Sequence, residues 1–230
     1  VVRIRNLSKH FEGYPKPALK GIDCEIQRGH IVGLVGPDGA GKTTLLRLIA
    51  GLLLPTTGAI EVDGFDTIKQ AQEIHSIIGY MPQKFGLYED LSVLQNLTLY
   101  ADLRNVVGEE RKKTFARLLK FTGLAPYQDR LARNLSGGMK QKLGLSCALV
   151  YTPTLLLLDE PSVGVDPISR RELWKMVFEL VAEGITVIWS SSYLDETEKC
   201  HSVLLLNEGE LLYDGSPQEF TGRVEGRVFK

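Results

Sequence analysis

The sequence HIVGLVGPDGAGKTTLLRLIAG, residues 30–51, decides the fold of this chain. It opens with a near-continuous apolar run that ends at Val35, which predicts a buried strand. A glycine-rich turn follows over Gly36 to Thr43, and apolar residues then recur at helical spacing until Gly51. The order of buried strand, glycine-rich turn and helix predicts an α/β fold with a phosphate-binding turn between the strand and the helix.

This turn fits the pattern G-x-x-x-x-G-K-[ST] at every fixed position. Its glycines let the backbone curl so that successive N–H groups face inward, and the next helix adds its positive N-terminal end. We expect Lys42 to reach the β- and γ-phosphates of a nucleotide and the Thr43 hydroxyl to bind Mg²⁺. The alternative is a chance match, which is expected about once per hundred chains of this size. The candidate phosphate-binding residues are Gly36, Pro37, Asp38, Gly39, Ala40, Gly41, Lys42, Thr43 and Thr44.

A second apolar run, Leu155 to Leu158, ends in the acidic pair Asp159-Glu160. Ligands of open parallel sheets bind at the carboxyl ends of the strands, where this pair is expected to lie. We expect Asp159 to hold Mg²⁺, directly or through water, and Glu160 to orient or deprotonate an attacking water. The alternative is a strand that ends in solvated acids, but the phosphate-binding turn in the same chain favours the functional interpretation.

A second candidate anion site begins at Ser136-Gly137-Gly138, in the stretch Leu135 to Gln141 that opens an apolar helix. Ser136 can cap this helix, and the two glycines allow an anion to approach the backbone closely. The alternative is an ordinary capped loop before a helix. If both helix starts bind phosphate, a dimer can use them, with each subunit covering the nucleotide that the other holds.

Composition excludes several classes of protein. Lys plus Arg number 27 and Asp plus Glu 28 among 230 residues, so the basic excess typical of nucleic-acid-binding domains is missing and no nucleic acid is expected. No apolar run approaches the roughly 18 residues of a membrane span. Cys24, Cys147 and Cys200 are widely separated and suggest neither disulfides nor a zinc site, which fits a reducing cytosol.

The pattern along the chain predicts one domain over residues 1–230. Apolar and polar residues alternate near the N-terminus, which predicts an antiparallel β part, whereas about Ser92 to Val150 is predominantly helical in pattern. We assign residues 1–82 and 151–220 to a nucleotide-binding core and residues 83–150 to an inserted helical subdomain. Residues 221–230 are polar and predict a tail or linker, and with the missing initiator Met they favour a piece of a longer chain.

These motifs, in this order, resemble the ATP-binding cassette of ABC transporters over essentially the whole chain. The resemblance includes Gln83 after a strand, the signature Leu135 to Met139 and the turn Pro161 to Asp166. It implies a P-loop NTPase core with a mixed, mainly parallel sheet, an antiparallel β subdomain and the inserted helical subdomain. It also implies two cassettes packed head to tail around two ATP molecules, each site joining one phosphate loop to the other signature.

Further roles follow from the resemblance. Phe11 is similar to the aromatic residue that stacks on adenine; Tyr14 is an alternative stacker, and a buried Phe beside an edge strand is the alternative role for Phe11. Gln83 is similar to the residue that links Mg²⁺ and water to the helical lobe, so Thr43, Gln83 and Asp159 form the expected metal set. The segment Phe85 to Leu97 would dock on membrane helices.

Two positions depart from the family pattern. Ser192 stands where the family has its switch histidine, and serine is too short to reach the γ-phosphate or to share a proton with Glu160, so slower hydrolysis is expected. Asp38 stands where the family commonly has Asn or Ser and places a carboxylate near the polyphosphate; alternatively, it points to water and costs little. We therefore expect a hydrolytic site with reduced activity, in which the catalytic residues are Glu160, Gln83, Lys42 and Ser192.

The leading expectation is an ATPase that powers membrane export of drugs or other small molecules through ABC-2-type transmembrane subunits. Met139, where many members have Gln, points to this exporter branch. We expect a peripheral location on the cytoplasmic face of the inner membrane and a second cassette, in an asymmetric pair or in the same polypeptide. The alternatives are a soluble ribosome-associated ABC ATPase and a non-catalytic nucleotide switch.

Overall fold

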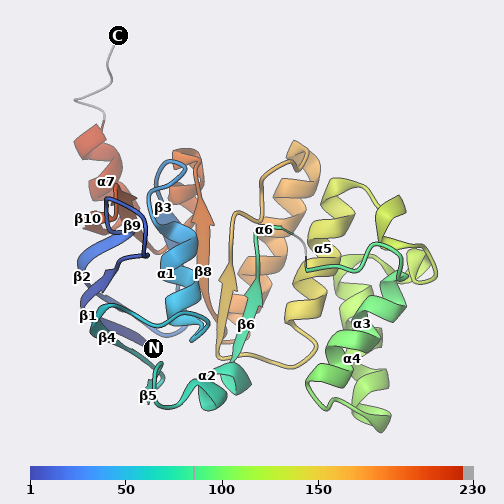
Figure 1. Ribbon diagram of the computed structural model, residues 1–230. Helices are drawn as coiled ribbons and strands as arrows, with labels where there is room; N and C mark the ends of the chain where they lie inside the picture. Colours follow the sequence, from blue (N-terminus) through green and yellow to red (C-terminus); the bar gives the residue numbers. More distant parts are fainter. Residues whose placement is uncertain (85, 225–230) are drawn as a thin grey trace.

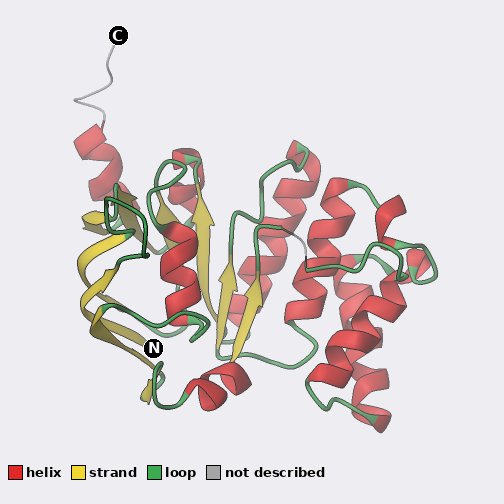
Figure 2. Cartoon of the chain, in the orientation of Figure 1, coloured by secondary structure: helices red, strands yellow, loops and turns green. Residues whose placement is uncertain are grey.

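The computed structural model of the chain describes residues 1–84 and 86–224 (Figure 1). Figure 2 separates its helices, strands and loops by colour. The elements in chain order are β1 (Val2–Lys9), β2 (Leu19–Ile26), β3 (Ile31–Val35), α1 (Lys42–Ile49), β4 (Thr57–Val62), β5 (Phe65–Asp66), α2 (Ala71–Ile77), β6 (Ile78–Met81), α3 (Val93–Leu103), α4 (Gly108–Thr122), η1 (Ala125–Tyr127), η2 (Ala132–Asn134), α5 (Gly137–Ala148), β7 (Leu155–Leu158), α6 (Pro167–Ala182), β8 (Thr186–Ser191), η3 (Leu194–Lys199), β9 (Ser202–Asn207), β10 (Glu210–Gly215) and α7 (Pro217–Val224).

A six-stranded sheet in the order β10-β9-β3-β8-β7-β6 forms the centre of the fold. The pairs β9–β3, β3–β8, β8–β7 and β7–β6 are parallel, whereas β10 pairs with β9 antiparallel. Every residue of β3 and β7 is buried, as expected for parallel strands that are covered on both faces. The predicted α/β fold with a mixed, mainly parallel sheet is therefore confirmed.

The four leucines of β7 show how the sheet is covered. Leu155 and Leu157 belong to the hydrophobic cluster that contains α1 and strands of the second sheet. Leu156 and Leu158 belong to the other large cluster, with residues of α5 and α6. Because successive side chains of a strand point to opposite faces, one short apolar strand serves both clusters.

A second sheet, in the order β2-β1-β4-β5, is antiparallel throughout. Val2 of β1 pairs with Ile26 on one side and with Val62 on the other. The predicted antiparallel β part is confirmed, and β4 and β5 are added to it from residues 57–66, which carry no clear alternation. Only Ile60 and Val62 of β4 are buried, because one face of this strand is largely open to solvent.

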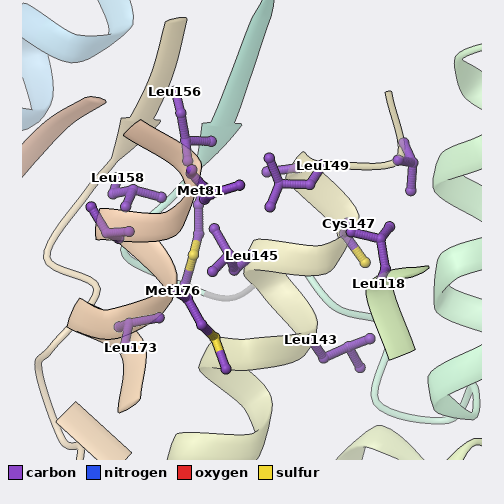
Figure 3. Packing of buried hydrophobic residues seen from close by; sticks show 14 of the residues in the cluster. Met81, Leu118, Leu143, Leu145, Cys147, Leu149, Leu156, Leu158, Leu173 and Met176 are labelled. Atoms are coloured by element: carbon purple, nitrogen blue, oxygen red, sulfur yellow. The ribbon is translucent and has the colours of Figure 1, made fainter. Parts of the chain in front are cut away.

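The helices α3, α4 and α5 lie beyond the β6 edge of the main sheet (Figure 1). Ser92 caps α3 in a capping box with Gln95, as its sequence position predicts. Gly123 ends α4 in the left-handed conformation, with φ 68°. Figure 3 shows how Leu145 of α5 packs with Met81 of β6 in the cluster that joins these helices to the sheet.

The C-terminal prediction needs correction. Residues 221–224 belong to α7 rather than to a polar tail, and this helix is anchored by the ring of Phe220, whose centroid lies 5.3 Å from that of Tyr213. The rest of the predicted tail lies outside the described residues, as does Phe85 of the predicted docking segment. Among the described residues, no helix combines the length and apolar character that a membrane crossing needs.

Candidate functional site

The glycine-rich turn connects β3 to α1, as predicted, and two of its glycines are required by close backbone contacts. A Cβ on Gly36 would lie 2.1 Å from the carbonyl oxygen of Leu206, and a Cβ on Gly41 would lie 2.7 Å from that of Ala18. Gly41 is also the residue that precedes α1, with φ 107°. A side chain at either position would therefore force the turn away from the strands that hold it.

Lys42 is buried and folds back over the turn. Its Nζ donates hydrogen bonds to the carbonyl oxygens of Gly36 at 2.6 Å and Pro37 at 3.1 Å. The same Nζ lies 2.9 Å from Glu160 Oε1 and 3.1 Å from Ser192 Oγ. An ammonium group carries three protons, so these four oxygens already compete for it before any phosphate is present.

Asp159 is buried at the end of β7 and accepts hydrogen bonds from three elements. The Thr43 hydroxyl of α1 and the Ser190 hydroxyl of β8 both donate to its Oδ1 at 3.0 Å. The Tyr80 hydroxyl of β6 donates to Oδ2 at 3.3 Å. Burial, and then the charge of Asp159, raises the pKa of Tyr80, which keeps that phenol a donor.

The oxygen atoms of Thr43 and Asp159 suit Mg²⁺, which prefers hard oxygen ligands. The described residues contain no group of three or more His, Cys, Asp or Glu side chains that could hold a metal by themselves. A Mg²⁺ ion beside Thr43 and Asp159 would therefore complete its coordination with phosphate oxygens, water or Gln83. Ser190 and Tyr80 were not predicted, because only the sheet order brings their strands beside β7.

Glu160 lies directly after β7 in a backbone conformation that is uncommon for a residue with a Cβ, with φ 50°. Its N–H donates to Ser190 Oγ at 2.9 Å, and its carboxylate accepts from the Ser192 N–H at 3.2 Å. The residue is 3% exposed. Such locally unfavourable backbone is common at active sites, where the surroundings hold one reactive group in place.

Ser192 directly follows β8, as expected, and lies within hydrogen-bond distance of two carboxylates. Its Oγ lies 2.8 Å from Glu160 Oε1 and 3.1 Å from Asp38 Oδ1. The expectation that serine is too short to share a proton with Glu160 is therefore wrong. Asp38 is exposed, as its alternative role expects, and it also accepts a hydrogen bond from the Ser192 hydroxyl.

A cavity of about 280 Å³ brings most of the predicted residues together. Gln83 contributes to its wall from the segment after β6, although this side chain is exposed and makes no hydrogen bond in the described part of the structure. The lining residues are Ala18, Asp38, Gly39, Ala40, Gly41, Lys42, Thr43, Thr44, Gln83 and Glu160.

A second cavity, of about 500 Å³, adjoins the first through Ala18 and Gly39, which line both. Phe11 and Tyr14 form part of its wall, with ring centroids 6.5 Å apart. Phe11 is only half-buried, so the alternative of a buried core Phe is wrong. The pair offers an aromatic surface beside the phosphate turn, and Glu208 and Gly209, which sequence patterns did not single out, complete the cavity with Lys16 and Pro17.

At the second candidate anion site the predicted helix cap is present, but this helix start does not line the phosphate cavity. Ser136 caps α5 by accepting the Met139 N–H at 3.3 Å. A Cβ added to Gly137 would lie 3.0 Å from the Gly164 carbonyl oxygen, and one added to Gly138 would lie 2.4 Å from Ser169 Oγ. None of the residues lining the phosphate cavity in the described structure comes from this helix start.

Comparison with known proteins gives a consistent result. The family described as ABC transporter matches residues 19–163. The "Probable multidrug ABC transporter ATP-binding protein YbhF" of Escherichia coli (strain K12) is 62% identical over 229 residues, which cover 100% of this chain and 40% of that protein. The chain therefore spans less than half of this relative. The "Linearmycin resistance ATP-binding protein LnrL" of Bacillus subtilis (strain 168) is 34% identical over 227 residues, covering 98% of this chain and 72% of that protein.

Solved structures agree with the sequence relatives. One is the "Dimeric structure of a post-hydrolysis state of the ATP-binding cassette MJ0796 bound to ADP and Pi", with a TM-score of 0.86 and 26% identity. The match covers 94% of this chain and 99% of that one. With a phosphate turn, an acidic strand end and a capped second helix start in family order, this chain belongs to the ABC transporter family as one of its ATP-binding domains.

Proposed function

We propose that this chain binds Mg-ATP and hydrolyses it to drive export of drugs or other small molecules through ABC-2-type transmembrane subunits. The observation that carries the proposal is the convergence of Lys42, Thr43 and Glu160 around one cavity, with Asp159 hydrogen-bonded to Thr43 beside it. In this proposal ATP is held by the N–H groups of the turn and by Lys42, while Phe11 or Tyr14 stacks on adenine. Thr43, Asp159 and Gln83 are the proposed Mg²⁺ ligands.

Glu160 is the proposed group that orients or deprotonates the attacking water. Without nucleotide its carboxylate pairs with the Lys42 ammonium at 2.9 Å. Phosphate oxygens are stronger competitors for Lys42 than the turn carbonyls are, because they carry charge. Phosphate binding would thus draw Lys42 away from Glu160 and leave the carboxylate free to accept a proton.

A second cassette belongs to the proposal because one chain does not bring both anion sites together. The phosphate cavity has no lining residue from Ser136, Gly137 or Gly138. A head-to-tail pair would place this helix start over the partner's nucleotide, and the solved cassette with ADP and Pi is described as dimeric. The length of YbhF, of which this match covers 40%, has room for a second cassette in one polypeptide.

Transport, rather than work on ribosomes, is supported by what the relatives are called: a probable multidrug transporter protein and a linearmycin resistance protein. A peripheral location at the cytoplasmic face of the inner membrane follows from such a role. The docking surface for the transmembrane subunits would lie on the segment from residue 86 to Leu97, at the start of the helices beyond β6.

The hydrolytic site of this chain is proposed to be slow, because Ser192 has no ring nitrogen that could transfer a proton near the γ-phosphate. Its single hydroxyl proton is shared between Glu160 and Asp38. The Ser192→His variant is expected to raise the single-turnover rate of ATP hydrolysis by at least about tenfold, within the range of general acid–base catalysis. Ser192→Ala should be no faster than the wild type.

Both rates are measured with the purified chain, alone and with its partner cassette, and ATP binding is measured separately by calorimetry. A Glu160→Gln variant supplies the background, since it should still bind ATP but not turn it over. A wild-type rate as high as that of Ser192→His would overturn the impairment. ATP binding without any turnover, in the wild type and the His variant alike, would favour the regulatory switch.

A further inference from the structure

Glu196, in η3, has a carboxylate that is buried without a cationic partner. The residue is 1% exposed, and it takes part in none of the ion pairs of the described residues. Burying an unneutralised charge costs free energy unless hydrogen bonds compensate it. The hydrogen bonds that this carboxylate accepts must therefore compensate for its burial.

Four hydrogen-bond donors from three separate elements converge on this carboxylate. Oε2 accepts from Ser191 Oγ at 2.6 Å, Trp189 Nε1 at 2.9 Å and Ser162 Oγ at 3.0 Å. Oε1 accepts from Trp174 Nε1 at 3.4 Å. The two indole rings stack with centroids 4.0 Å apart, so both are held rigidly. A network with every member satisfied fixes one geometry.

Three consecutive serines link this network to the phosphate site. Ser190 donates to Asp159, Ser191 donates to Glu196, and Ser192 contacts Glu160. Ser191 Oγ also accepts the N–H of Tyr193 at 3.0 Å. Glu196 therefore fixes the residues on both sides of Ser192, and through them the position of Ser192 against Glu160.

On its other side, Glu196 holds the turn 161–166 through Ser162, two residues after Glu160. This turn lies against the start of α5, where a Cβ on Gly137 would make a tight contact of 3.0 Å with the Gly164 carbonyl oxygen. Ser162 is completely buried, so its hydroxyl has no water to replace Glu196. One carboxylate thus joins the strand end that carries Glu160 to the helix start that would face a second nucleotide.

We propose that Glu196 is a positioning residue for ATP hydrolysis, which it serves by setting Glu160 and Ser192 relative to the turn 161–166. This inference rests on the proposed ATPase function. Within the described residues, Glu196 neither lines the phosphate cavity nor hydrogen-bonds a residue that does, so its loss should change the rate of the chemical step more than the binding of ATP.

The test compares Glu196→Gln and Ser162→Ala with Ser146→Ala as a matched control. Ser146 is also a buried serine with one hydroxyl hydrogen bond, to Lys142 O within α5. Steady-state kcat and KM for Mg-ATP are measured for each full chain. We expect both test variants to lower kcat roughly three- to tenfold with KM changed less than about twofold, and the control to keep the wild-type values.

The double variant is expected to lose little more than the worse single variant, because Glu196→Gln weakens the same hydrogen bond that Ser162→Ala removes. An unchanged kcat in a folded Ser162→Ala protein overturns the inference, even if Glu196→Gln fails to fold. Equal losses in both serine variants also overturn it, since they indicate a general effect of buried hydroxyls. Absence of turnover in the wild type would instead show that the proposed ATPase function has failed, and the positioning role with it.

Discussion

Ser192 carries one hydroxyl proton and faces two carboxylates, those of Glu160 and Asp38. Lys42 donates to the same hydroxyl oxygen and pairs with Glu160. Lys42, Ser192 and Glu160 thus contact one another, and Asp38 joins them through the Ser192 hydroxyl. Any change of charge here alters both ATP binding and the freedom of Glu160, so the effects of substitutions are best separated by measuring binding and turnover independently.

Asp38 provides a test of charge at this site. The Asp38→Asn variant is expected to bind ATP about two- to fivefold more tightly, because it removes one negative charge from the wall of the phosphate cavity. The increase should shrink as salt is added, since the side chain is exposed. Calorimetry at two ionic strengths measures this change in ATP affinity.

Asp90→Asn is the matched control for this change. Asp90 is an exposed acid whose partner, Arg133, belongs to η2, and neither residue lines the phosphate cavity. Unchanged ATP affinity is expected for this variant. If Asp38→Asn also bound ATP no better than the wild type, the proposed repulsion between Asp38 and the polyphosphate would be wrong.

At the scale of elements, side-chain caps decide where the functional helices begin. Ser136 caps α5, and Asp166 caps α6 by accepting the N–H groups of Ile168 and Ser169. Each cap lies within a segment that the site uses: Ser136 in the signature, and Asp166 at the end of the turn 161–166. Their short polar side chains favour a cap over a continued helix, which is why the sequence predicts these starts well.

The cap of α3 gives a stability prediction that is independent of the phosphate site. Ser92→Ala should lower the free energy of unfolding by about 1 kcal/mol, because it removes the acceptor for the Gln95 N–H at 3.2 Å in the capping box. Urea unfolding followed by circular dichroism measures the loss. Ser76→Ala serves as the control, since the Ser76 hydroxyl bonds only the Glu73 carbonyl within exposed α2. A similar loss of unfolding free energy in both variants would contradict the assignment of this effect to the helix cap.

At the scale of the whole molecule, two histidines lie side by side in the main sheet, directly before the neighbouring strands β3 and β9. The rings of His30 and His201 stack with centroids 5.0 Å apart, and His201 Nδ1 accepts the Ile31 N–H at 3.0 Å. Burial, and next the neighbouring His30, lowers the pKa of His201 from its ordinary value of 6.5. The folded protein therefore binds fewer protons at this site than the unfolded chain does near that pH.

This difference predicts that His201 contributes its full stability above pH 6.5 and that the contribution is lost as the pH falls below it. The His201→Asn variant, which keeps an acceptor near the Ile31 N–H, should show a smaller fall in the free energy of unfolding between pH 7 and 5. His10→Asn, at an exposed position after β1, controls for the loss of one imidazole. An equal fall in the free energy of unfolding of the wild type and of His201→Asn over this pH range would contradict the prediction.

Local patterns in the sequence specified much of the molecule. The apolar strand before Gly36, the phosphate turn and the capped helix starts could be predicted because each depends on neighbouring residues alone. Strands such as β4 escaped prediction because one of their faces is open and their alternation is weak. The helix α7 escaped it because its anchor, Phe220, packs on Tyr213 of β10, a contact that a polar segment does not reveal.

The sequence by itself determined the phosphate turn, the acidic pair and the missing histidine, since motif chemistry lies in residue types at fixed spacing. Only the tertiary structure decided that Ser192 contacts Glu160 and Asp38, that Ser190 and Tyr80 hold Asp159, and that four donors surround Glu196. The physical reason is that these contacts join strands and turns more than 30 residues apart in most cases, and parallel pairing in the sheet sets their distances. The spacing of residues along the chain identifies the chemical groups of the site. The order of the strands in the sheet decides which of these groups come into contact.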